Sequence, residues 1–228
     1  MQRPFTFGIV GLIVGLAVGF LAANAINRNT ATRSSGSQAP AAASNAQTVI
    51  SETAPGGMQA DVAQTLNKAD SEPENFVAQM EAGDMYARIG RFEKAVEYYR
   101  RGIAVKPADL NANIVLANAL FDSRQFEEAE AFYTKALLIE PKDLNARTDL
   151  GTTFVERTKP DYDRAIKEFK AALEIDPKHE PTLYYLGIAY FRKGDKANAE
   201  KALADLEKTN PESVLIGRLR QNMEEQQR

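Results

Sequence analysis

Five prolines divide most of the chain into segments of nearly equal length. They are Pro73, Pro107, Pro141, Pro177 and Pro211, which follow one another at spacings of 34, 34, 36 and 34 residues. A fixed period of this length indicates a repeat array, in which each segment is one supersecondary unit that shares its core with its neighbours. Apolar residues recur at helical spacing inside the segments, and a proline stops a helix. The sequence therefore predicts an all-α array of helix pairs.

The interior of each segment repeats one pattern. The first helix carries a leucine or alanine, then a glycine or alanine, and a large side chain three residues later. The second helix carries an alanine, a large side chain four residues later, and a small or apolar residue before the proline. In chain order the units hold Ala82-Gly83, Tyr86, Ala95, Tyr99 and Gly102; Leu116-Ala117, Leu120, Ala129, Tyr133 and Ala136; Leu150-Gly151, Phe154, Ala165, Phe169 and Ala172; and Leu186-Gly187, Tyr190, Ala199, Leu203 and Leu206. This pattern resembles the tetratricopeptide-repeat family, although tryptophan is absent and the last unit departs from the pattern at its two late leucines.

The resemblance implies a solenoid of about four helix–turn–helix units whose first helices line a concave groove. The array is expected over residues 73–211, with units at about 76–109, 110–143, 144–179 and 180–211. Residues 57–72 are expected to form a weak helix that covers the first unit. Residues 212–228 are expected to form a C-terminal capping helix, because a polar-backed stretch there carries several apolar side chains.

Turn residues give local expectations. Asp109 and Asp143 precede first helices and are expected to cap their free N–H groups. Gly90 and Gly194 fall in turns between paired helices, where a positive φ costs glycine little. The third unit is two residues longer than the others, and the extra length falls within 156–163, at the turn between its helices.

Residues 5–25 carry no charged side chain. As a helix they would span about 31 Å, close to the bilayer hydrocarbon thickness of about 30 Å. This predicts a transmembrane helix that follows a short tail, residues 1–4, and is retained as a signal anchor. Cleavage as a signal peptide is the alternative, because Ala23-Asn24-Ala25 gives a small-x-small pattern. The apolar stretch is, however, longer than the usual hydrophobic region of about 7–15 residues.

Arginines flank this segment on both sides. Arg3 precedes it while Arg28 and Arg33 follow it, so the positive-inside rule gives nearly a tie. Because the N-terminal head is short and the following stretch resembles an exported linker, we expect the repeats on the periplasmic side of a bacterial inner membrane. Cleavage near Ala25 would instead give an exported soluble protein.

Gly11, Gly15 and Gly19 fall along one stripe of the expected transmembrane helix. Such a stripe lets two helices approach closely, which favours a homodimer or docking on a partner's membrane span. The alternative is that glycine is simply common in membrane helices.

Residues 26–56 are rich in small and polar residues and contain three charged side chains. A segment of this composition cannot bury enough apolar surface to offset its ordering entropy. We expect a disordered linker that acts as a tether between the membrane and the repeats.

Composition argues against several classes of function. The absence of cysteine excludes a thiolate metal site or a cysteine nucleophile, and the formal net charge of −3 provides no basic face for nucleic acid. The single histidine, His179, is expected to be a solvated loop residue between the third and fourth units. No phosphate-binding loop or metal-ligand spacing is present, so neither catalysis nor a cofactor is expected.

By the resemblance, the exposed stripe of each first helix forms the partner groove. The candidate residues are Asp84, Arg88, Asn111, Ile114, Asn118, Phe121, Asn145, Thr148, Thr152, Tyr184, Ile188 and Phe191. Asparagine and threonine can hydrogen-bond an extended peptide backbone, and the last three residues would form an apolar pocket. The alternative is that this apolar stripe packs on the C-terminal helix.

These expectations describe a membrane-tethered adaptor or scaffold that binds a protein or an extended peptide, in the assembly of an envelope complex. Two alternatives remain. One is a structural spacer that associates with itself, and the other is a subunit of a maturation apparatus such as cytochrome c biogenesis.

Overall fold

The structure, a computed structural model, describes residues 55–225, with side chains from Asp61 onward. This range contains ten helices and no strand. The helices are α2 (Pro55–Ser71), α3 (Phe76–Arg88), α4 (Phe92–Val105), α5 (Leu110–Asp122), α6 (Phe126–Ile139), α7 (Leu144–Glu156), α8 (Tyr162–Ile175), α9 (Glu180–Lys193), α10 (Lys196–Thr209) and α11 (Val214–Glu225). None of these ten is both long enough and apolar enough to cross a membrane. The expected transmembrane helix and its glycine stripe lie outside the described residues.

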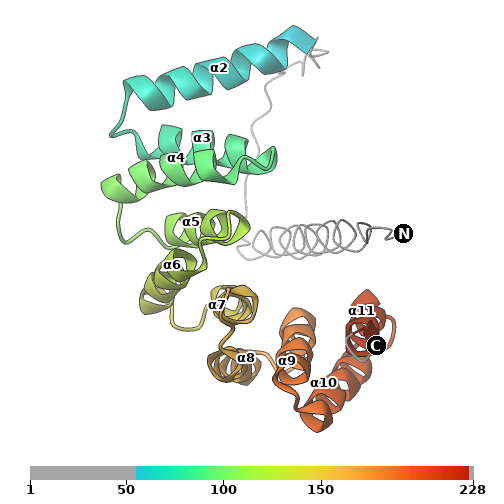
Figure 1. The fold of residues 1–228 in the computed structure, drawn as a ribbon. Coiled ribbons are helices and arrows are strands. Elements are labelled where there is room, and N and C mark those ends of the chain that lie inside the picture. The colour runs from blue at the N-terminus through green and yellow to red at the C-terminus, as the bar shows by residue number, and fades with distance from the viewer. Residues whose placement is uncertain (1–54, 226–228) are drawn as a thin grey trace, which may run out of the picture. The chain divides into compact units, whose positions relative to one another are not determined.

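Neighbouring helices pack against one another in chain order. Four pairs, α3–α4, α5–α6, α7–α8 and α9–α10, are called units one to four below. Figure 1 shows the first helix of each unit on one side of the array and the second helix on the other. The expected all-α repeat solenoid is confirmed for residues 55–225.

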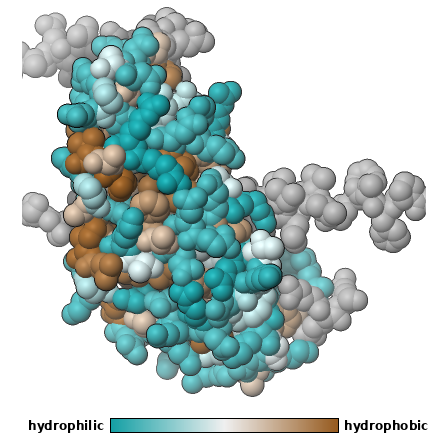
Figure 2. All heavy atoms as spheres, turned by 60° about the vertical axis from the view of Figure 1, so that its left-hand side comes forward, coloured by the Kyte–Doolittle hydropathy of each residue, from teal (hydrophilic) through white to brown (hydrophobic). Residues whose placement is uncertain are grey.

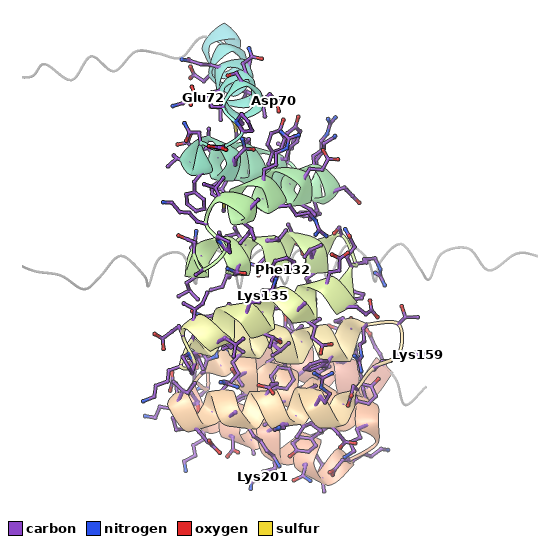
Figure 3. All side chains as sticks on the ribbon, turned by 90° about the vertical axis from the view of Figure 1, so that its left-hand side faces the viewer. Asp70, Glu72, Phe132, Lys135, Lys159 and Lys201 are labelled. Carbon is purple, nitrogen blue, oxygen red and sulfur yellow. The ribbon has the colours of Figure 1, made fainter. Side chains whose placement is uncertain are left out.

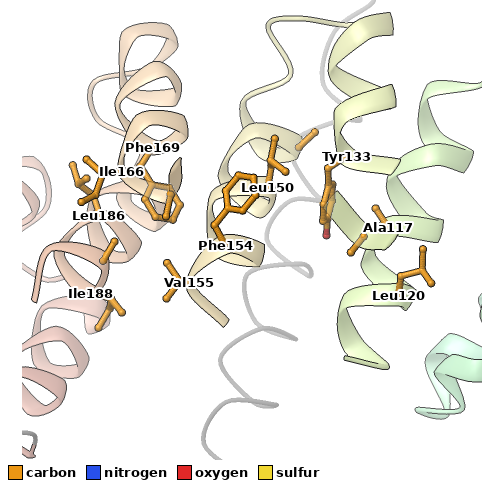
Figure 4. Close-up of a cluster of buried hydrophobic side chains, with 14 of the residues drawn as sticks. Ala117, Leu120, Tyr133, Leu150, Phe154, Val155, Ile166, Phe169, Leu186 and Ile188 are labelled. Atoms are coloured by element: carbon orange, nitrogen blue, oxygen red, sulfur yellow. The ribbon is translucent and has the colours of Figure 1, made fainter. Parts of the chain in front are cut away.

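A shared core runs between the units. Tyr133 and Phe169, from two second helices, are fully buried, and Phe154 is 1% exposed (Figure 4). Gly151 lets the first helix of unit three lie close to Phe169, since a Cβ at this glycine would sit 2.5 Å from the ring. The repeated pattern thus pairs a small residue on one helix with a large side chain on its partner, and that pairing sets the helix separation.

The predicted helix caps are confirmed. The Asp109 carboxylate accepts the N–H of Ala112 at 2.9 Å, and that of Asp143 accepts the N–H of Ala146 at 2.8 Å. Each bond satisfies one of the backbone donors that a helix N-terminus leaves free. Asn75, Asp161 and Asp195 cap three further helices in the same way.

The turn glycines also behave as predicted. Gly90 has φ of 73° and Gly194 has φ of 90°, both in the left-handed region. The equivalent position of unit two is Arg124, which adopts φ of 63° although it has a side chain. Left-handed backbone costs a residue with a Cβ about 1–2 kcal/mol, so Arg124 stores strain that its two glycine counterparts avoid.

Replacing Arg124 with glycine is therefore expected to stabilise the array. We expect a net gain of about 0.5–1 kcal/mol in the free energy of unfolding, because the added flexibility of the unfolded chain offsets part of the relieved strain. Urea unfolding followed by circular dichroism measures the change. An Arg124→Ala variant keeps the strained backbone and serves as the control, and equal stability of the two variants would contradict this account.

The extra residues of unit three lie in its turn, as predicted. Five residues, 157–161, separate α7 from α8, whereas three separate the helices of units one and two. Arg157 of this turn forms ion pairs with Asp161 at 3.2 Å and with Glu130 of α6 at 3.6 Å. Lys159 of the same turn is labelled in Figure 3. The ion pair between Arg157 and Glu130 therefore links the longer turn to unit two.

Polar side chains replace the missing tryptophan of the family pattern. Gln79 donates to the carbonyl of Ala69 at 2.5 Å, and Asn113 donates to the carbonyls of Pro107 and Asp109. Arg147, at the equivalent position of unit three, donates to the carbonyl of Pro141 at 2.8 Å. The first helices of units one to three thus bind carbonyl groups at or near the turn that precedes each of them, whereas unit four has Leu183 at this position.

The first and last helices are half-units. With the 34-residue period, Asp61, Thr65 and Lys68 of α2 match Ala95, Tyr99 and Gly102 of α4. Likewise Arg220, Gln221 and Glu224 of α11 match Leu186, Gly187 and Tyr190 of α9. The positions of α2 and α11 that correspond to helix-contacting positions in the complete units are therefore polar, as in terminal repeats that face water.

The opposite face of each half-unit contacts the neighbouring complete unit. Asp70 of α2 accepts hydrogen bonds from Tyr98 at 3.1 Å and from Arg101 at 2.8 Å (Figure 3). Leu219 of α11 is fully buried and lies against Gly187.

Candidate partner-binding face

The first helices α3, α5, α7 and α9 present the residues that were predicted to bind a partner. We call these helices' shared surface the first-helix face. Among the candidates, Arg88 and Asn111 are exposed. Six others are half-buried: Asp84, Ile114, Asn118, Phe121, Asn145 and Tyr184. These eight residues have surface that a partner can reach.

The remaining four candidates are buried, and the expectation that they line an open groove is wrong. Thr148 and Thr152 are each 3% exposed, Ile188 is 4% exposed and Phe191 is 8% exposed. The reason is a direct approach of α7 to α9, in which the Thr148 and Thr182 hydroxyls lie 2.7 Å apart. The Thr152 hydroxyl donates to the backbone carbonyl of Thr148 rather than facing solvent.

The apolar stripe of unit four packs on the C-terminal helix, which was the alternative considered from the sequence. Helix α11 packs on α9, and the core that contains Ile188 and Phe191 also contains Leu219 and Met223. The Asn222 amide lies 3.5 Å from the Tyr184 hydroxyl. The C-terminal helix therefore borders the first-helix face at unit four instead of leaving an apolar pocket there.

Two candidates already serve the fold. The buried Tyr99 hydroxyl donates to the Asp84 carboxylate at 2.6 Å, and Tyr133 donates to the Asn118 carbonyl oxygen at 2.6 Å. Units three and four have Phe169 and Leu203 at the tyrosine position, and their first helices carry Thr152 and Ile188 opposite. In units one and two this polar residue thus accepts the hydrogen bond of a buried tyrosine hydroxyl, so Asp84 and Asn118 already take part in the packing of their units.

Two carboxyl groups without an ion pair lie on the first helices of units two and three. Asp122 at the end of α5 and Asp149 on α7 are half-buried, and neither forms an ion pair within the described residues. The pKa of each is raised to about 7, by burial for Asp122 and by burial together with the Asp143 and Asp122 carboxylates for Asp149. By contrast, Glu156 forms an ion pair with Arg192 at 2.8 Å.

Asp149 is expected to destabilise the array at neutral and alkaline pH. Its pKa is near 4 in the unfolded chain and about 7 in the fold, so the unfolded state ionises first as the pH rises. The free energy of unfolding therefore falls between about pH 4 and 7 and stays low above that range. Asp149→Asn is expected to raise the Tm by a few degrees at pH 8, at about 2–4 °C per kcal/mol, and to change it little at pH 4. The exposed Asp205→Asn is the control, and a Tm difference that does not depend on pH would contradict this assignment.

His179 differs from its expected role as a solvated residue. It is half-buried at the N-cap of α9, and its Nδ1 lies 2.6 Å from the Thr182 hydroxyl. Burial lowers the pKa of His179 below its usual range. Through Thr182 and Thr148 it belongs to the hydrogen-bonded contact between units three and four.

The described surface includes two open hollows. One open hollow is lined by Glu127, Arg157, Thr158 and Lys159, and a second by Pro73, Glu74, Arg101, Ala104 and Val105. Leu138 of α6 is 78% exposed. Figure 2 shows hydrophobic areas separated by hydrophilic side chains on the face that it displays. Scattered apolar side chains are ordinary for a protein surface.

Four stacked helix pairs with small-to-large packing and polar end helices define a helical-repeat protein. A family profile described as tetratricopeptide repeat matches residues 60–110 and 80–147. A second profile, the cilia and flagella-associated protein 70 middle TPR-like domain, matches residues 114–218. The chain belongs to the tetratricopeptide-repeat (TPR) family.

Solved structures share this fold. A crystal structure of MamA has 19% identity and a TM-score of 0.62, and the match covers 68% of this chain and 90% of that one. A MamA structure from Desulfovibrio magneticus RS-1 has 18% identity and a TM-score of 0.63, covering 70% and 89%. YrrB, described as a TPR protein with an unusual peptide-binding site, has 19% identity and a TM-score of 0.63, covering 73% and 84%. No curated protein sequence matches the chain.

Proposed function

We propose that the protein is a scaffold or adaptor that binds a partner protein, as an extended segment, across the first-helix face. The observation that carries this proposal is the set of side chains that this face presents. The face presents exposed asparagine, half-buried aromatic and aliphatic side chains and unpaired carboxyl groups. Buried and half-buried polar groups without partners are a recurrent mark of binding sites. The description of YrrB as peptide-binding supports the same mode of action.

We further propose that the chain is tethered to a bacterial inner membrane by residues 5–25, with the repeats on the periplasmic side. The uncharged N-terminal sequence supports this tether, and the small and polar linker supports a repeat array that moves freely from it. In this setting the scaffold would act in the assembly of an envelope complex. A homodimer through Gly11, Gly15 and Gly19 is the alternative basis for a purely structural spacer.

A charge-matched pair of variants tests the binding face. Glu81→Lys with Asn111→Lys places two lysines on exposed positions of α3 and α5. Glu93→Lys with Ala131→Lys makes the same change in charge on exposed positions of α4 and α6. Full-length protein is expressed in the source cell and crosslinked, and its partners are identified by mass spectrometry.

The proposal predicts that a specific partner is retained by the wild type and by the α4–α6 variant, and lost from the α3–α5 variant. Equal retention by both variants would reject the first-helix face as the binding site. Recovery of only the protein's own copies, lost when the three glycines are replaced by leucine, would favour the self-associating spacer.

A further inference from the structure

Unit four begins with a different pair of polar residues from the other units. Asn75, Asp109 and Asp143 each cap a first helix by accepting the N–H of an alanine three residues later. At the equivalent positions unit four has His179 and Thr182. The His179 side chain caps no backbone N–H, and its Nδ1 lies 2.6 Å from the Thr182 hydroxyl. The start of unit four therefore lacks the usual cap and has a contact between two side chains instead.

This contact continues across the joint between units three and four. Thr182 and Thr148 are both buried, and their hydroxyl oxygens lie 2.7 Å apart where α9 meets α7. The Thr148 hydroxyl donates to the backbone carbonyl of Leu144 at 2.8 Å. A row of three hydrogen bonds thus runs from His179 to the backbone of α7.

The row has only one direction in which all three hydrogen bonds form. The Leu144 carbonyl can only accept, so it takes the single hydroxyl proton of Thr148. Thr148 must then accept from Thr182, and Thr182 must accept from Nδ1 of His179. The neutral imidazole therefore carries its proton on Nδ1 and has its lone pair on Nε2. A second proton binds at Nε2 and places a positive charge on a half-buried ring, although no bond of the row has to break.

Nearby charged groups offset only part of the cost of that charge. Burial lowers the pKa of His179, although Asp176 in the preceding turn and Glu180 both favour the charged ring. Glu180 also accepts a hydrogen bond from Asn210, at the end of α10, at 2.9 Å. The charged residues that flank the row along the chain are Arg147, Asp149 and Lys178. Of these, the arginine is held in an ion pair with Glu168 of α8 at 2.7 Å.

The neutral ring therefore favours the folded joint. The pKa of histidine is about 6.5 in an unfolded chain and lies lower for His179 in the fold, so the unfolded state takes up the proton first as the pH falls. The stabilisation is fully present above about pH 6.5 and is lost as the pH falls through the folded pKa.

We propose that the contact between units three and four is a pH-sensitive joint, closed when His179 is neutral and loosened when a proton binds at its Nε2. Loosening exposes the surfaces of α7 and α9 that the contact encloses, including Thr148 and Thr182. This regulation goes beyond the proposed binding of a partner, because it needs only residues of this chain.

Nitrogen NMR of the imidazole tests the direction of the row. His179 is the single histidine of the chain, so its signals need no assignment. The full-length protein, labelled with nitrogen-15 at histidine, is titrated in nonionic detergent. The inference predicts the Nδ1–H tautomer in the neutral ring and a pKa below the usual value of about 6.5. A neutral Nε2–H tautomer, or a pKa at or above the usual value, would overturn it.

Amide hydrogen exchange tests the joint itself. The variant His179→Asn with Thr182→Ala gives unit four the same cap as Asn75 and Ala78 in unit one, and it removes the titrating ring. After correction for intrinsic exchange rates, α9 of the wild type is expected to exchange at least about twofold faster at pH 5 than at pH 7, relative to the variant. Exchange in units one and two is expected to be the same in both proteins.

The comparison separates a pH-sensitive joint from a purely structural contact. Asp122 and Asp149, which titrate in a nearby range, are present in both proteins, so their effects cancel. If the variant changed exchange in α9 by the same factor at both pH values, or did not change it at either, the proposed joint would be rejected.

Discussion

Replacing Phe169 with alanine is expected to lower the free energy of unfolding by about 3–5 kcal/mol, the usual cost of deleting a buried aromatic side chain. Phe169 is fully buried in the core that joins units three and four. Its ring fills the space beside Gly151 and stacks on Tyr185, so its loss leaves a cavity between three helices. Urea unfolding of the full-length chain, followed by circular dichroism, measures the change.

The array supplies its own control for this variant. Unit four has Leu203 at the position of Phe169, which indicates that leucine can pack against a first helix there. Phe169→Leu is therefore expected to cost less than half as much as Phe169→Ala. Similar losses for the two variants would mean that the aromatic ring itself, and not the filled volume, holds these units together.

Replacing Leu219 with alanine is expected to cost about 2–5 kcal/mol, because the residue is fully buried where α11 covers α9. Gly187 lies so close that a Cβ there would sit 2.7 Å from Leu219. Loss of this contact would release α11 and expose the core around Ile188. Amide hydrogen exchange is expected to speed up first in α11 and then in α9.

Val214 provides the control for the C-terminal helix. It is on the same helix and 73% exposed, so Val214→Ala should change the stability by less than about 0.5 kcal/mol. If Leu219→Ala left exchange in α9 unchanged, α11 would be an appendage and not a cap of the array.

Much of the fold could be predicted from the sequence because its determinants are local and repeated. The proline period, the small-to-large pattern and the caps Asp109 and Asp143 each depend on residues within one unit. Gly90 and Gly194 marked the left-handed turns, but Arg124 shows that the turn geometry persists without glycine. At Arg124 the residue type therefore gave no sign of the left-handed turn.

The exposure of side chains on the first-helix face was harder to predict, because burial there depends on distances between units. Thr148, Thr152, Ile188 and Phe191 have the same helical phase as half-buried residues in units one and two, but the approach of α7 to α9 and the packing of α11 enclose them. The sequence did contain a signal for two hydrogen bonds, Tyr99 with Asp84 and Tyr133 with Asn118. Both pairs are 15 residues apart and lie at equivalent positions of their units. The sequence contained no signal that Asp122 and Asp149 lack an ion-pair partner, because that depends on where every other charge lies.

Photo-crosslinking at single positions tests the central claim most directly. A photoreactive amino acid is placed in the full-length chain at Asn111, exposed on α5, or at Ala131, exposed on α6. The account predicts that one specific partner crosslinks in the source cell from position 111 and not from position 131. Crosslinking from 131 alone, or equally from both positions, would contradict the proposal that the first helices bind the partner.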